Sequence, residues 1–265
     1  MIINSAEVGR NEIEKLLQKK PFDEVELPPK IRDFNKKIFG KDLTASELVK
    51  KIVDDVRHKG DAAVIDYTKK FDNVEISTEN FLVTDDEILF AESQVDKKVI
   101  KSLQRAAENI RLYHREQLPK SWITYRGKNS ILGQSIISLE RVGVYIPGGL
   151  AAYPSSVLMN VIPAKVVGVN EIIMCVPSKV GKINPYVLMA AKIAGADKIF
   201  KIGGAQAIAA MAFGTATIPR VNKITGPGNI FVTLAKKEVY GHCDIDMLAG
   251  PSEILIIADE SANPI

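Results

Sequence analysis

Several features that indicate particular classes of protein are scarce or missing in this sequence. Its 265 residues include two cysteines, Cys175 and Cys243, too few for a disulfide framework and typical of a reducing cytoplasm. No apolar run is long enough to span a bilayer, and the first fifteen or so residues are too polar for a secretory signal. The formal net charge of +3 does not indicate nucleic acid or a membrane as a partner. We therefore expect a soluble cytoplasmic protein that binds neither.

Patterns for metal binding and nucleophilic catalysis are missing as well. Of the three histidines, His58 and His114 lie in charged helical stretches and are expected at the surface. Residues 242–246 (HCDID) contain metal-ligating types, but their spacing fits no tetrahedral site and indicates strand alternation instead. Cys175 lies within an apolar strand and is expected in the core. There is no HExxH motif, and GPSE lacks the GxSxG form of a nucleophile elbow.

The sequence does contain a regular series of short apolar runs in its second half. These runs end near Ile146, Val176, Ile202 and Thr225, about one βαβ unit apart, and stop at glycine or proline. Helical patterns follow them at 155–167, 185–194, 206–213 and 229–240. Strands this uniformly apolar are typical of a parallel sheet covered on both faces. We therefore predict an α/β fold with a doubly wound, mostly parallel sheet, an incomplete Rossmann-like domain.

The loops after these strands are the candidate binding site, since they share one edge of such a sheet. They are Pro147-Gly148-Gly149, Gly203-Gly204-Ala205-Gln206 and Gly226-Pro227-Gly228-Asn229. Small residues would let a backbone approach a ligand, and the following helix N-termini favour anions such as pyrophosphate. Alternatively, glycine and proline are present only because turns need them. Gln206 could likewise serve only as an amide that caps the following helix. A strict GxGxxG is absent, so a dinucleotide would be held in a non-standard way.

The first half of the chain has a different pattern. Residues 8–19 predict a short amphipathic helix, and 22–41, with two prolines, predict an extended arm. Further helices are expected at 44–58, 61–71, after the capping residue Thr84, and at 96–118. Residues 81–83 look strand-like, and 122–125 with 135–139 predict a hairpin around Gly127-Lys128-Asn129.

These patterns predict a division of the chain into four parts. Residues 1–40 form the helix and arm, and 41–141 form the first part of one α/β domain. Residues 142–250 form the second α/β domain, which holds the candidate binding loops. Residues 251–265 return to the first domain, because the apolar strand expected at 254–258 needs a sheet to join.

Four ordered motifs together resemble a known family. They are GVYIPGG (143–149), GGAQAIAA (203–210), GPGN (226–229) and IDMLAGPSE (245–253). From about Asp61 to its last residue, the sequence is similar to the N-terminal part of histidinol dehydrogenases.

The resemblance implies an enzyme of histidine biosynthesis. It implies the NAD-dependent, zinc-requiring, four-electron oxidation of L-histidinol to L-histidine through histidinaldehyde. The family's NAD contacts correspond to Tyr145, Gln206 and Asn229, and its substrate contact corresponds to Ser252. The resemblance also implies homodimers with interlocked subunits.

One departure from the family pattern concerns the catalytic residues. In the family, a Gln-x-x-His segment, a Glu-His pair and the remaining zinc ligands all follow the AGPSE motif, whereas this sequence ends at Ile265. We therefore expect a C-terminally truncated chain with no catalytic residue and no metal ligand of its own. The Zn²⁺ ligands are expected beyond residue 265, and the isolated chain is expected to be inactive.

Two alternatives stay open at this point. The first is an aldehyde-dehydrogenase-like oxidoreductase, which needs an activated cysteine on a loop, a context that neither Cys175 nor Cys243 has. The second is a non-catalytic fragment or a complementing subunit of a histidinol dehydrogenase.

Overall fold

The computed structural model of the protein describes residues 8–18, 27–148, 152–249, 256 and 258–263. At its centre lies a five-stranded sheet with the order β5-β4-β3-β6-β7, in which every neighbouring pair is parallel. The strands are β3 (Arg141–Tyr145), β4 (Glu171–Cys175), β5 (Lys198–Phe200), β6 (Lys223–Thr225) and β7 (Asp244–Ile245). The chain adds strands on one side of β3 and then on the other, so the sheet is doubly wound with its switch point between β3 and β6. The predicted fold class is confirmed.

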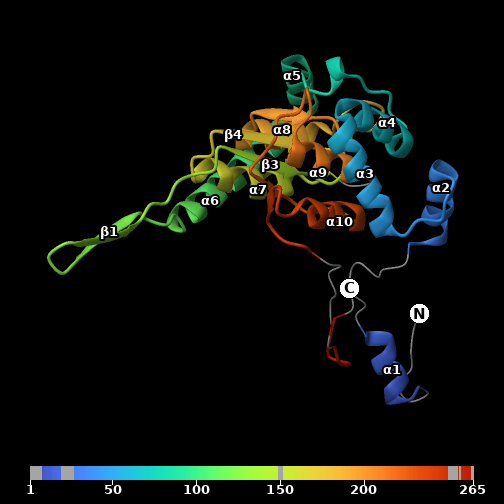
Figure 1. The fold of residues 1–265 in the computed structure, drawn as a ribbon, viewed down its shortest axis with the longest axis horizontal. Helices are drawn as coiled ribbons and strands as arrows, with labels where there is room; N and C mark the ends of the chain where they lie inside the picture. The colour runs from blue at the N-terminus through green and yellow to red at the C-terminus, as the bar shows by residue number, and fades with distance from the viewer. Residues whose placement is uncertain (1–7, 19–26, 149–151, 250–255, 257, 264–265) are drawn as a thin grey trace.

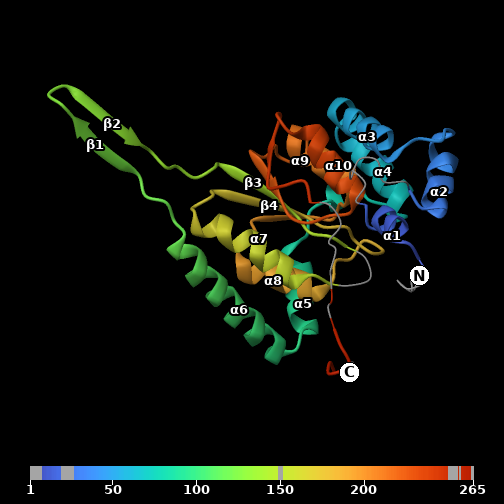
Figure 2. The ribbon, with the colours of Figure 1, turned by 90° about the horizontal axis from the view of Figure 1, so that it is seen from below.

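Helices cover both faces of the sheet (Figure 2). One face carries α7 (Pro154–Val166) and α8 (Pro185–Ala194), with α6 (Lys97–Glu116) and α5 (Asp85–Gln94) packed outside them. The other face carries α9 (Gly204–Phe213) and α10 (Ile230–Val239), covered in turn by α3 (Ala45–Lys59) and α4 (Asp61–Asp72). Alternate residues of each strand enter opposite cores: Val144 lies in one and Tyr145 in the other. Helices α3 to α6, from the first half of the chain, therefore form the outer layers on the two faces of this sheet.

Local sequence signals explain where the outer helices begin. Thr44 and Glu47 form a capping box at α3: the Thr44 hydroxyl accepts from the Glu47 amide at 3.2 Å, and the Thr44 amide donates to the Glu47 carboxylate at 2.9 Å. Thr84 and Glu87 repeat the arrangement at α5. By contrast, residues 205–212 of α9 are buried throughout, since α9 lies between the sheet and α3. Among the described residues, no helix combines the length and apolarity needed to cross a membrane.

The prediction of an extended arm over 22–41 is wrong for most of the residues described there. They form α2 (Pro29–Phe39), which ends at Gly40 in the left-handed region. Proline is favourable at the first position of a helix, because its fixed φ suits the helix and its missing N–H leaves no donor unpaired there. In the sequence, the same prolines indicate an extended arm. The remaining elements of this half are α1 (Arg10–Leu17) and the 3₁₀ turn η2 (Thr78–Asn80).

The hairpin is present, but its second strand lies at residues 130–134 and not at the predicted 135–139. β1 (Trp122–Arg126) pairs antiparallel with β2 (Ser130–Gln134), so that Trp122 lies opposite Gln134. The tight turn at residues 127–129 fixes this register, and the similar alternation at 135–139 lies outside the ladder. Figures 1 and 2 both show the hairpin extending away from the helices and the sheet.

The division into two α/β domains stays a prediction. Of the strand expected at 254–258, residues 254, 255 and 257 lie outside the described residues, as do 250–253. The residues that the structure does describe before 141 contribute helices, the hairpin and, within the strand-like stretch 81–83, an isolated antiparallel bridge from Leu82 to Phe200 of β5.

Replacing Gly226 should disrupt the sheet at its switch point. Its φ is +113°, and an added Cβ would lie 2.0 Å from the carbonyl oxygen of Tyr145, the last residue of β3. Gly241 is a matched control, because its φ is +98° and no atom lies within 4 Å of its added Cβ. In urea unfolding, we expect Gly241→Ala to lose about 1–2 kcal/mol from backbone strain alone. Gly226→Ala should lose more than about 3 kcal/mol; equal losses would show that the close approach does not matter.

Candidate functional site

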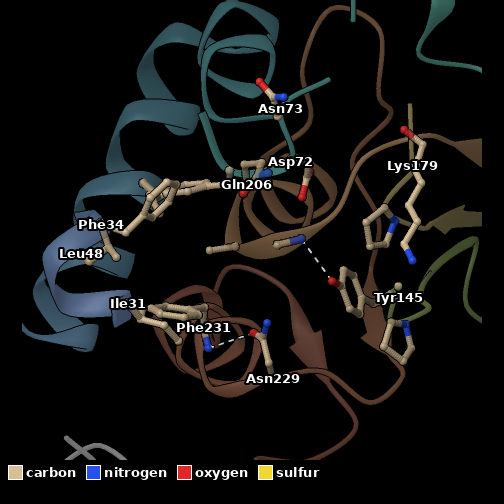
Figure 3. A pocket seen from close by; sticks show the side chains of 18 of the residues that line it. Ile31, Phe34, Leu48, Asp72, Asn73, Tyr145, Lys179, Gln206, Asn229 and Phe231 are labelled. Atoms are coloured by element: carbon tan, nitrogen blue, oxygen red, sulfur yellow. Dashed lines mark hydrogen bonds between the residues drawn. The ribbon is translucent and has the colours of Figure 1, made fainter. Parts of the chain in front are cut away.

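A cleft of about 730 Å³ lies at the carboxyl edge of the sheet, a volume typical of ligand sites (Figure 3). Loops following four of the strands form one wall, and α2, α3 and α4 form the other. The predicted residues Tyr145, Gln206 and Asn229 all line this cleft. It includes the switch point between β3 and β6, where doubly wound sheets bind their ligands.

Tyr145 ends β3 and turns its ring toward the start of α9. Its side chain is buried, and its hydroxyl oxygen accepts a hydrogen bond from the Gly204 amide at 3.1 Å. Burial, together with the nearby negative charge of Asp72, raises the pKa of the Tyr145 phenol well above its usual value. The phenol is therefore neutral and keeps its proton for donation to a further group.

Gln206 lies in the first turn of α9 and points into the cleft (Figure 3). It is 1% exposed, and neither atom of its amide has a hydrogen-bond partner among the described residues. The alternative role as a capping amide does not hold, because α9 begins without a side-chain cap. A buried polar group without a partner costs about 1–3 kcal/mol.

Other buried polar atoms without a partner gather in the same place. Of such side-chain atoms in the described part of the chain, most belong to residues that line the cleft: Asn35, Asp72, Ser178 and Gln206. Buried polar groups are almost always paired in folded proteins. Their concentration here indicates that a polar ligand supplies the missing hydrogen bonds.

Asn229 has a double role at the start of α10. Its side-chain oxygen caps the helix, accepting from the Phe231 amide at 3.1 Å and the Val232 amide at 3.2 Å. This arrangement leaves the Nδ2 amino group as a donor on the cleft side (Figure 3). The residue thus holds the helix and presents a donor at the same time.

The loop between β6 and α10 is held by a charged pair that the sequence analysis missed. Lys236 of α10, which is 4% exposed, donates to the Gly226 carbonyl and, at 2.7 Å, to the Asp246 carboxylate. Asp246 also accepts from the Gly226 amide at 2.9 Å. In the sequence, the signal for this pair is a lysine within the apolar part of a helix. Asp246 is identified there only as a residue type that can bind a metal.

Asp72 is the second residue that the sequence analysis missed. It is the last residue of α4 and lies on the cleft wall facing the strand loops. Its Oδ2 atom is buried without a partner in the described structure, and burial raises the pKa of its carboxyl group to about 6. The other ionisable side chains that line the cleft belong to Tyr145 and Lys179. No local pattern in the sequence marks Asp72.

The glycines of the binding loops serve packing within the protein. An added Cβ at Gly148 or at Gly203 would lie 2.5 Å from the side chain of Pro177, which follows β4. Two neighbouring loops therefore contact one proline, and the requirement for small residues comes from this contact. The sequence analysis predicts that small residues let the loop backbone approach a ligand. At Gly148 and Gly203 the structure gives a different reason, the contact with Pro177.

Ser252 and Gly149 lie outside the described residues, so the substrate-side assignment of Ser252 stays a prediction. Cys175 is buried, as expected, and Cys243 is buried as well. Burial raises the pKa of both thiols, that of Cys243 to about 11, so neither has the low pKa of an activated nucleophile. Within the described ranges, no group of three or more His, Cys, Asp and Glu side chains is placed to hold a metal ion.

Fold and cleft together define a doubly wound α/β protein with a ligand site at the switch point of its sheet. Comparisons with known proteins give the family. A profile described as histidinol dehydrogenase matches residues 37–265. The chain belongs to the histidinol dehydrogenase family.

Individual relatives agree with this result. The chain is 56% identical to a histidinol dehydrogenase of Heliobacterium mobile over 224 residues, which are 84% of this chain and 52% of the relative. It is 55% identical to that of Clostridium acetobutylicum, over 82% of this chain and 50% of the relative. The crystal structure of histidinol dehydrogenase from Elizabethkingia anophelis is similar with a TM-score of 0.77 and 38% identity, covering 90% of this chain and 55% of that one. The chain spans about half the length of the curated relatives it matches.

The unpaired carboxylate of Asp72 should lower stability as the pH rises. Its folded pKa of about 6 lies above the ordinary value of 3.8, so the folded state binds more protons between these two values. Stability relative to Asp72→Asn should therefore be greatest below about pH 4 and fall by about 1–3 kcal/mol as the pH rises through 6. Urea unfolding of both proteins between pH 4 and pH 8 measures this difference. A difference that does not change with pH would mean that the carboxylate is paired or solvated.

Proposed function

We propose that this chain is the NAD-binding part of a histidinol dehydrogenase, which oxidises L-histidinol to L-histidine through histidinaldehyde and reduces two NAD molecules. The observation that carries the proposal is the meeting of Tyr145, Gln206 and Asn229 in one cleft, with the Gln206 amide buried and unpaired. Membership of the family, over most of this chain, supports the reaction.

Each of the three residues has a group free to hold the cofactor. The Tyr145 hydroxyl accepts from Gly204 and can donate its own proton. Gln206 offers one donor and one acceptor, and Asn229 offers its amino group. The N-termini of α9 and α10 adjoin the same cleft and favour a pyrophosphate there. NAD, when bound, supplies the acceptor for the hydride that leaves the substrate.

The remaining parts of the reaction extend beyond these three residues. We propose that Ser252 contacts L-histidinol and that the whole protein is a homodimer with interlocked subunits. The described residues do not fit a zinc site. The proposal places the Zn²⁺ ligands and the acid–base residues outside residues 1–265.

Substitutions at Gln206 and Asn229 should have opposite effects on stability and the same effect on NAD binding. Gln206→Met removes two unpaired polar atoms at similar volume, so it should stabilise the free protein by about 1 kcal/mol. Asn229→Ala removes the cap of α10 and should cost about 0.5–2 kcal/mol. Both should weaken NAD binding about three- to tenfold, because each removes a hydrogen bond to the cofactor.

Thermal unfolding and calorimetric titration with NAD measure these two effects separately. The free wild-type protein is the reference for both. If Gln206→Met destabilises the protein and leaves NAD affinity unchanged, the amide has a structural role and the assignment of Gln206 is wrong.

Histidinol-dependent formation of NADH tests the whole proposal. We expect no turnover and no stoichiometric zinc for this chain, and both for a chain of the relatives' full length. In the longer chain, Ser252→Ala should raise the KM for histidinol and leave the constant for NAD within about twofold, since loss of one neutral hydrogen bond is confined to the substrate. Turnover and zinc in the 265-residue chain would show that the catalytic residues have been misplaced, and an effect of Ser252→Ala on NAD alone would refute its role.

A further inference from the structure

The sheet lacks an acidic residue at the position where dinucleotide-binding folds usually have one. In doubly wound sheets that bind NAD, a carboxylate about 20 residues beyond the first loop accepts a hydrogen bond from the ribose 2′-hydroxyl. Here the second strand in the order of addition, β4, is followed by Val176, Pro177, Ser178 and Lys179. This loop lines the cleft and carries a cation where an anion is usual.

Asp72 brings a carboxylate to the same cleft from the opposite wall. It lies at the end of α4 and lines the same cleft as Gln206 and Tyr145, all three of which are labelled in Figure 3. Burial, and to a smaller extent the negative charge of Asp72, raises the pKa of the Tyr145 phenol. Among the residues of the cleft wall described in the structure, no other side chain is acidic.

Packing and pairing within the protein do not account for this carboxylate. A negative charge is least favourable at the C-terminal end of a helix, which is where Asp72 lies. The nearest lysines of the helix have other partners: Lys70 pairs with Asp66 at 2.6 Å, and Lys69 pairs with Glu75 at 2.8 Å. The Oδ2 atom of Asp72 is buried, and no group of the described structure donates to it.

We infer that Asp72 is a specificity residue of the cofactor site: its carboxylate accepts a hydrogen bond from a ribose hydroxyl of NAD and disfavours NADP, which carries a phosphate there. The inference rests on the proposed function of the cleft. An ionised carboxylate is a hydrogen-bond acceptor only, so it matches a hydroxyl and repels a phosphate. Its Oδ2 atom is also buried, and burial strengthens the effect of a charge.

Lys179 is the residue with the opposite preference. A lysine near the ribose would attract the additional phosphate of NADP, and Lys179 lines the same cleft. Its side chain is exposed, however, so water and salt screen its charge. We therefore expect the buried carboxylate to decide the preference.

Calorimetric titration of the 265-residue chain with NAD and with NADP tests the inference. The wild-type protein should bind NAD more tightly than NADP. Asp72→Asn should bind NAD about tenfold or more weakly, because a hydrogen bond to a charged acceptor is lost, while the affinity for NADP stays or improves. Asp66→Asn is the matched control, being the same substitution in an exposed ion pair of the same helix, and should change neither affinity. Lys179→Ala should weaken NADP binding only, by less than about threefold.

The outcomes separate this inference from the proposed function. If the wild-type protein binds neither nucleotide, the proposed function of the cleft has failed. If it binds NAD and Asp72→Asn leaves the ratio of the two affinities unchanged, Asp72 has no such role and only the inference is overturned. Equal losses for NAD and NADP overturn it as well. Thermal unfolding checks that the variant is folded, and Asp72→Ala serves as a second variant with the same expected ratio.

Discussion

A buried ammonium group, that of Lys236, lies beneath the loop that closes the switch point of the sheet. It donates to the carbonyl of Gly226 and to Asp246, which in turn accepts from the amide of Gly226. Buried charges are favourable only where further hydrogen bonds satisfy them, and the backbone of this loop provides these bonds. Because the loop is fixed, Gly226 can lie against the backbone of Tyr145. The geometry of the cleft therefore depends on this charged pair.

The two walls of the cleft contribute different chemistry. The strand loops supply helix N-termini and neutral donors, which suit a phosphate chain, whereas α4 supplies a carboxylate. In the free protein several of these groups have no partner, which lowers stability. Such a cost is typical of functional sites, where a ligand completes the hydrogen bonding. The outer helices therefore take part in the site as well as covering the sheet.

The sequence was a good guide where structure follows from local pattern. The apolar runs ending near Ile146, Val176, Ile202 and Thr225 predicted four of the strands of the sheet, because buried parallel strands have few polar residues. Thr44 and Thr84 predicted helix starts correctly, since a capping box involves only neighbouring residues. The same reasoning failed at Pro29, where a proline at a helix start is indistinguishable in isolation from one in a linker.

The site was predictable only in part, for a physical reason. The motifs located Tyr145, Gln206 and Asn229, but the burial of Gln206 without a partner depends on helices from the first half of the chain. The roles of Lys236 and Asp72 depend on parts of the chain that are distant in sequence. Lys236 donates to the Gly226 carbonyl, and Asp72 lines the same cleft as the strand loops. No spacing rule along the chain predicts these positions: the one signal for Lys236 is a lysine within an apolar helix, and no local pattern marks Asp72.

Hydrogen exchange with and without NAD, followed by mass spectrometry, tests most directly whether the cleft is the cofactor site. The account predicts that saturating NAD slows exchange in the loops at 203–206 and 226–231 and, across the cleft, in the C-terminal turn of α4. The hairpin β1–β2 lies far from the cleft and should exchange at the same rate in both samples. Protection confined to regions outside the cleft, or equal protection of the hairpin and the loops, would contradict the account.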